Sequence, residues 1–117
     1  MPKHYATITP AKQAYRVYFG DELLFETQRV LELVEHMGER AFPAVPYFAP
    51  PLESSSIELR SNDAESRCPL KGVASYFDFR GVSAAIWSYA QPLDAVTPIA
   101  GHYGFDTSKG FRVEPVS

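Results

Sequence analysis

The amino-acid sequence predicts a mainly β protein, a small antiparallel sheet or half-barrel with one short α-helix. Short segments rich in aromatic and β-branched residues recur along the 117 residues, and turn-forming residues separate them. Only one segment repeats apolar residues at helical spacing. The length fits a single domain over residues 1–117, and 45% hydrophobic against 21% charged residues can supply a buried core.

The N-terminal third predicts three strands followed by the helix. Residues 5–9 and 15–19 have the composition of two hairpin arms, and residues 23–25 continue the meander after a Gly-Asp turn. The helix is expected over residues 28–37. Thr27 is a suitable N-cap, apolar residues recur at positions 30, 31, 34 and 37, and Gly38 suits a left-handed C-terminal cap.

Prolines interrupt the next segment and leave room for short strands at residues 45–49, as an edge strand, and 57–59. The polar residues at 54–56 and 61–63 indicate loops. Residues 73–79 and 82–89, joined by an Arg-Gly turn, predict a hairpin at the centre of the sheet.

The C-terminal quarter predicts smaller elements. Pro98 limits residues 93–99 to a helical turn. Two late strands are expected at residues 102–105 and 111–113, around a turn formed by Ser108, Lys109 and Gly110.

Charge and composition argue against several partners. The formal net charge is −3, from 14 acidic against 11 basic residues without a basic run, which disfavours nucleic-acid binding. One cysteine cannot form an internal disulfide, and the N-terminus lacks the apolar run of a signal peptide, so a cytoplasmic protein is expected. No stretch approaches the ~20 apolar residues that cross a membrane.

Several motifs are long enough in combination to indicate a family. They are Arg16-Val17 with Gly20, the expected strand-to-helix passage from Leu24 to Leu33, Pro46-Tyr47-Phe48, Cys68-Pro69-Leu70-Lys71-Gly72-Val73-Ala74-Ser75-Tyr76, Trp87-Ser88-Tyr89 with Pro92, and Ile99-Ala100-Gly101. Together they resemble the domain-of-unknown-function family 427. The resemblance implies a compact antiparallel fold similar to the β-tent architecture of Mss4-like proteins, with no established activity. The sequence departs from the family pattern at Leu70, where a tyrosine is common, and at residues 105–107, where the family is richer in aromatics.

Cys68 and Lys71 are the candidate catalytic residues. Arg67 and Lys71 could favour the thiolate of Cys68, the form that acts as a nucleophile. The alternative is a structural cysteine before the turn at Pro69. Lys71, followed by the flexible Gly72, could bind an anionic ligand, or it could be a solvated loop lysine.

Aromatic and hydroxyl side chains would form the walls of a small-molecule pocket beside that turn. Strand alternation places Trp87 and Tyr89 on one face, where their polar atoms need partners if buried. The alternative is ordinary core packing. The candidate ligand-binding residues are Tyr47, Gly72, Tyr76, Trp87, Ser88 and Tyr89.

No metal or cofactor is expected. His4, His36 and His102 lie far apart in the sequence, and structural zinc ordinarily needs four ligands. A nucleotidyltransferase label attached to the resembled family implies paired carboxylates. The nearest pair, Asp63 and Glu65, lies in a segment that resembles a turn.

Two hypotheses of different classes therefore remain open. The first is a pocket for a small anionic ligand, with or without catalysis, formed by residues 68–76 and 87–89. The second is a non-catalytic interaction module, in which an exposed strand edge or residues 43–51 contact a partner. Self-association into a homo-oligomer is left open by both.

Overall fold

The computed structural model describes residues 3–52 and 57–117 of the protein. Within them the chain forms two antiparallel sheets and two short 3-10 helices. The strands are β1 (His4–Pro10), β2 (Tyr15–Phe19), β3 (Glu22–Thr27), β4 (Val30–Met37), β5 (Arg40–Ala41), β6 (Val45–Phe48), β7 (Arg60–Cys68), β8 (Gly72–Phe79), β9 (Val82–Ser88), β10 (Tyr103–Phe105) and β11 (Phe111–Pro115), and the helices are η1 (Asp94–Ile99) and η2 (Thr107–Lys109). The predicted mainly β class is confirmed.

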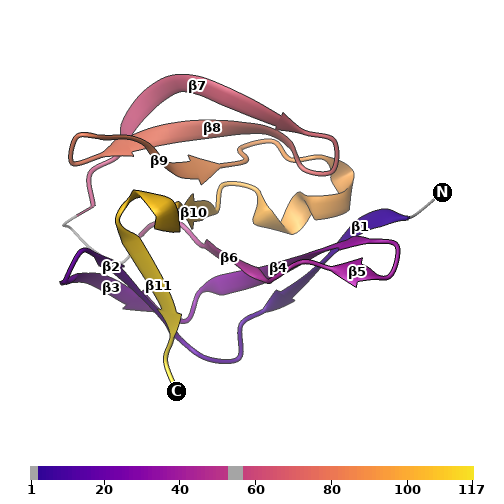
Figure 1. Ribbon diagram of the computed structural model, residues 1–117, viewed down its shortest axis with the longest axis horizontal. Coiled ribbons are helices and arrows are strands. Elements are labelled where there is room, and N and C mark those ends of the chain that lie inside the picture. Colours follow the sequence, from indigo (N-terminus) through magenta and orange to yellow (C-terminus); the bar gives the residue numbers. More distant parts are fainter. Residues whose placement is uncertain (1–2, 53–56) are drawn as a thin grey trace.

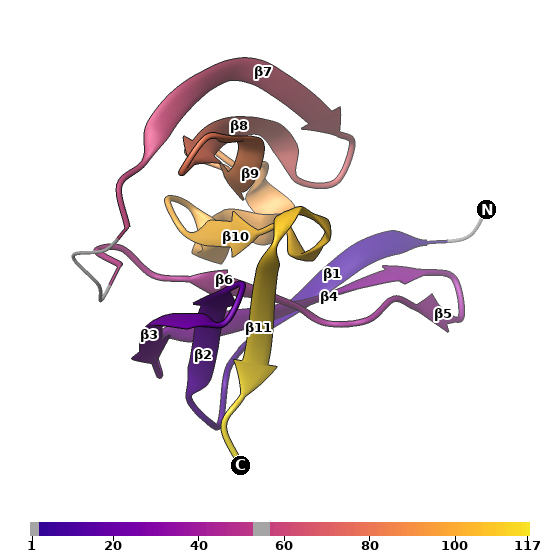
Figure 2. The ribbon, with the colours of Figure 1, turned by 60° about the vertical axis from the view of Figure 1, so that its left-hand side comes forward.

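The larger sheet has the order β1-β4-β6-β10-β9-β8-β7, with β5 added to β4, and the smaller has the order β11-β2-β3. The larger sheet bends around η1: β7, β8 and β9 lie on one side of this light orange turn, and β1, β4 and β6 lie on the other (Figure 1). A turned view shows the smaller sheet packed beside the lower half, with β11 crossing in front (Figure 2). The β-tent likeness stays a prediction.

Two buried clusters form on opposite faces of the larger sheet. Phe48 and Ile86 belong to the first cluster, whereas their chain neighbours Tyr47 and Trp87 face the second. Because successive strand residues point to opposite faces, β6 and β9 contribute to both clusters. The first cluster joins the two sheets and consists of Tyr15, Val17, Leu24, Phe25, Val30, Phe48, Phe79, Ala85, Ile86, Phe105 and Phe111. The second consists of Leu33, Tyr47, Ala74, Tyr89, Val96 and Ile99.

The α-helix predicted over residues 28–37 is wrong, because Val30–Met37 is strand β4. Strand β4 lies between β1 and β6, and both of its faces are covered. Val30 packs in the first cluster and Leu33 in the second, so apolar residues at both faces imitate a helical period. Thr27 accepts a hydrogen bond from the Arg29 backbone in a turn, and Gly38 has the expected left-handed backbone (φ +60°) in a hairpin.

The predicted hairpin between residues 5–9 and 15–19 is also wrong. Strand β1 pairs with β4 in the larger sheet, and β2 pairs with β3 and β11 in the smaller one. The short strand β6 was expected at an edge but lies between β4 and β10. Such pairings join segments distant in sequence, and local patterns carry little information about them.

Residues 61–63, expected as a loop, belong to the exposed edge strand β7. The register shifts between Asn62 and Glu65, and the Asn62 side chain accepts a hydrogen bond from the Ala64 backbone at 2.7 Å. Polar residues therefore form a β-bulge there. No strand covers residues 57–59, and the loop expected at residues 54–56 lies outside the described residues.

The β8–β9 hairpin is confirmed, with its turn at Arg80 and Gly81. It lies to one side of β10, the strand at the centre of the order, rather than at the centre itself. The helical turn at η1 and the late strands β10 and β11 are confirmed as well.

Candidate functional site

A cleft of about 540 Å³ opens where β6 and β10 part. These two strands pair only at Phe48 and Tyr103, and residues on both sides of that pair line the cleft. Five of the eight predicted site residues also line it. They are Tyr47, Lys71, Tyr76, Trp87 and Tyr89.

The floor of the cleft is a row of residues on four neighbouring strands, β8, β9, β10 and β6. Tyr76 on β8 faces Trp87 on β9, and Trp87 faces Gly104 on β10. A Cβ atom at Gly104 would lie 2.3 Å from the Trp87 ring, so the indole rests directly on the glycine backbone. At the far side, the ring of Tyr47 meets the indole edge to face, and Trp87 Nε1 donates a hydrogen bond to the Tyr47 hydroxyl at 3.3 Å.

Lys71 lies in the turn between β7 and β8. Gly72 has a left-handed backbone (φ +104°), which suits glycine, and the Lys71 carbonyl accepts a hydrogen bond from the Leu93 backbone at 3.0 Å. This turn directs the lysine side chain into the cleft, where it is only 15% exposed. Its ammonium lies 5.9 Å from the centre of the Tyr89 ring.

The Lys71 ammonium forms few polar contacts, although most of its side chain is shielded from water. Its nearest carboxylate oxygen, Glu35 Oε1, is 3.9 Å away, which is beyond hydrogen-bond distance. Within the described part of the chain, no hydrogen bond from this ammonium is formed. Its three N–H donors are therefore available to a group that enters the cleft.

Tyr89 lies next to Lys71 in the cleft. Burial raises the pKa of its hydroxyl above the ordinary tyrosine value, and neighbouring Tyr47, Cys68, Tyr76 and Glu35 raise it further. The hydroxyl of Tyr89 therefore stays protonated and can donate a hydrogen bond throughout the neutral range.

Three predicted site residues do not line the cleft. The Ser88 hydroxyl donates to the His102 carbonyl at 2.7 Å and joins β9 to the loop before β10. Gly72 packs against Leu93, and Cys68 is a half-buried free thiol at the end of β7. A nucleophilic role for Cys68 stays a prediction.

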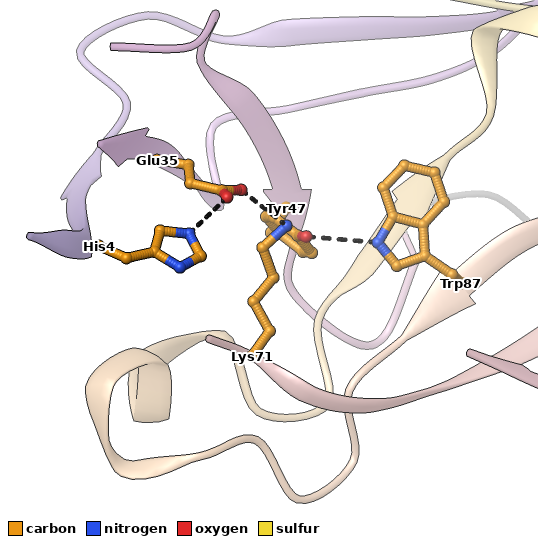
Figure 3. A network of polar contacts seen from close by, with 5 residues as sticks. All are labelled: His4, Glu35, Tyr47, Lys71 and Trp87. Carbon is orange, nitrogen blue, oxygen red and sulfur yellow. Dashed lines mark hydrogen bonds and ion pairs between the residues drawn. The ribbon is translucent and has the colours of Figure 1, made fainter. Parts of the chain in front are cut away.

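Sequence reasoning missed Glu35 and His4. The helix predicted over residues 28–37 hides the alternation that places Leu31, Leu33 and Glu35 on one face of a strand. His4 Nε2 lies 2.7 Å from Glu35 Oε2, so β1 and β4 place an ionisable pair next to Lys71 (Figure 3). Recognition of the strand, together with its pairing to β1, would have been needed to find it.

Among residues 3–52 and 57–117, no three His, Cys, Asp or Glu side chains gather closely enough to hold a metal ion. None of the helices in this described part is long and apolar enough to cross a bilayer.

Comparison with known proteins gives a family. No curated protein matches the sequence. A family model described as a domain of unknown function (DUF427) matches residues 7–115, which covers β2 to β11 and most of β1. The chain therefore belongs to the family of domain of unknown function 427.

Proposed function

We propose that the cleft binds a small organic anion, with its planar or aromatic part against Trp87 and Tyr76 and its charged group at Lys71. The observation that carries this proposal is the Lys71 ammonium, which faces the cleft, is 15% exposed and makes no hydrogen bond within the described residues. The carboxylate of Glu35, 3.9 Å away, balances the charge of this ammonium but accepts no hydrogen bond from it. An anionic ligand would supply the hydrogen-bond acceptors that a partly desolvated cation lacks.

The charges around the cleft favour a carboxylate over a phosphate. The lining residues include one cation, Lys71, and one carboxylate, Asp106. Asp106 already accepts hydrogen bonds from the Ser108 backbone at 2.9 Å and from its hydroxyl at 2.6 Å. With Glu35 only 3.9 Å from the same ammonium, the cleft has too little positive charge for a phosphate, because multiply charged phosphates are usually held by several donors.

The aromatic lining supports a planar ligand. Trp87 and Tyr76 face each other across paired strands, and the volume of about 540 Å³ falls in the range of small-molecule sites. Tyr and Trp at such positions combine an apolar surface with a hydrogen-bonding atom. An aryl or heteroaryl carboxylate is the ligand class that uses both properties.

A thermal-shift screen of small carboxylates tests the proposal. The variants are Lys71→Met and, as a matched control, Lys12→Met, which removes an exposed lysine. A ligand at about a hundred times its Kd stabilises a protein by about 2.7 kcal/mol, which raises Tm by several degrees. We expect chemically related hits with wild type and Lys12→Met and none with Lys71→Met. Hits that survive in Lys71→Met, or no hits in any of the three proteins, would overturn the proposal.

A further inference from the structure

Three ionisable side chains from distant parts of the chain meet behind the cleft. His4 on β1 contacts Glu35 on β4, and Glu35 approaches Lys71 from the side away from Trp87 (Figure 3). The two oxygens of Glu35 are divided between the partners, with Oε2 2.7 Å from His4 Nε2 and Oε1 3.9 Å from Lys71 Nζ. All three side chains are half-buried, with 26%, 29% and 15% of their surface exposed.

We infer that Glu35, held by His4, is the positioning residue for Lys71, and that protonation of His4 strengthens anion binding in the cleft. The inference rests on the proposed role of Lys71 as the group that binds the anion. It adds a regulation of the same site by pH.

The mechanism follows from the charges of the three groups. With neutral His4, the carboxylate of Glu35 balances the ammonium of Lys71, and the three groups have a net charge of zero. A protonated His4 shares the carboxylate at hydrogen-bond distance, and the net charge becomes positive.

Strand β1 packs against β4 and η1, so the other ionisable groups on β4 and η1 must be considered as alternatives to His4. On β4, Glu32 is occupied by a hydrogen bond from Tyr15. His36 lies on the opposite face, where it stacks on Tyr5. Asp94 in η1 is exposed. His36 is the histidine among these groups and lies away from Glu35 and Lys71, so it serves as the control.

Trp87 allows a test without the natural ligand. It is the only tryptophan of the chain and lines the cleft with Lys71. Quenching of its fluorescence by iodide, at constant ionic strength, measures how readily an anion reaches the cleft, and acrylamide corrects for simple exposure. The proteins are wild type, His4→Gln, His36→Gln, Glu35→Gln, Lys71→Met and the double variant Glu35→Gln/Lys71→Met, each compared at about pH 8 and about pH 5.5.

Iodide quenching of wild type is expected to rise about two- to fivefold on acidification, the effect of one unit charge a few ångströms away. His36→Gln should retain the rise, and His4→Gln should lose it. Glu35→Gln should quench strongly at both pH values, whereas the double variant should quench no more than Lys71→Met.

Failures of the two proposals are distinguishable. Equal quenching of wild type and Lys71→Met would contradict an anion site at Lys71 itself. A drop in Lys71→Met, together with an unchanged pH response in His4→Gln, would overturn only the role of His4. A double variant that quenches more than Lys71→Met, by the factor that separates Glu35→Gln from wild type, would show that Glu35 acts by its charge alone and does not position Lys71.

Discussion

The two buried clusters of the protein use aromatic residues for different purposes. Five of the eleven residues in the first cluster are phenylalanines, which meet mostly edge to face or tilted. Around the second cluster the aromatic residues are Tyr47, Tyr76, Trp87 and Tyr89, and each has a polar atom. Packing alone does not require those atoms, because phenylalanine would fill similar volumes. This difference agrees with our proposal, in which the first cluster stabilises the fold and the polar aromatic residues around the second contact a ligand.

The largest expected effect comes from Phe48 in the first cluster. Its ring is fully buried and contacts the rings of Tyr15, Phe25 and Phe105. Phe48→Ala should lower the free energy of unfolding by about 3–5 kcal/mol, because it removes apolar contacts and leaves a cavity. Chemical denaturation measures the change. A loss under 1 kcal/mol would contradict the assignment of this cluster as the stabilising one.

The next largest effect on stability is expected at the contact between Gly104 on β10 and Trp87 on β9. Gly104→Ala places a Cβ against the Trp87 ring, so the indole must move. We expect a cost of about 1–3 kcal/mol, as for other insertions into packed regions, together with a shift of the tryptophan emission. Adding Trp87→Ala should relieve most of the clash. Independent, additive costs would show that the indole does not rest on Gly104.

Alkaline pH should test the burial of the Tyr15 hydroxyl in the first cluster. Burial, and then the hydrogen bond to Glu32, raise the pKa of Tyr15 to about 12. Since the unfolded chain loses this proton near the ordinary value of about 10, its contribution to stability is complete below about pH 10 and falls between about pH 10 and 12. Denaturation midpoints measured across this range should decline more steeply for wild type than for Tyr15→Phe. Identical slopes would argue against a buried Tyr15 hydroxyl.

The smallest effect on stability is expected from the polar atoms of the cleft. Tyr47→Phe removes a fully buried hydroxyl, whose bond to Trp87 is long at 3.3 Å. Unfolding should change by about 1 kcal/mol or less. The affinity for a carboxylate ligand should nevertheless fall, because Tyr47 lines the cleft and its hydroxyl holds the Trp87 indole in place. Calorimetric titration and denaturation of the same variant compare the two quantities, and a large loss of stability with unchanged affinity would reverse our assignment.

The elements formed by residues close together in the sequence could be predicted from it. The β8–β9 hairpin follows from alternating apolar residues around Arg80 and Gly81, and its aromatic residues Tyr76 and Trp87 line the cleft. Family membership followed from motifs of the same kind.

The rest depends on pairings between distant segments. Strand β4 resembles a helix in sequence because the sheet buries both of its faces, and only its pairing with β1 brings His4 to Glu35. Gly104 is a similar case, because a glycine is needed there to make room for the Trp87 indole, which packs on it from another strand. Contacts of this kind have no local signature.

The indole N–H signal of Trp87 provides the most direct measurement of the central claim. A single tryptophan gives a single such signal, and its atom lies in the cleft beside Tyr47. Titration of wild type with aryl carboxylates, followed by NMR, should shift this signal saturably, and Lys71→Met should abolish the shift. Binding that leaves the Trp87 signal unmoved, or that shifts it equally in Lys71→Met, would contradict an anion-binding cleft.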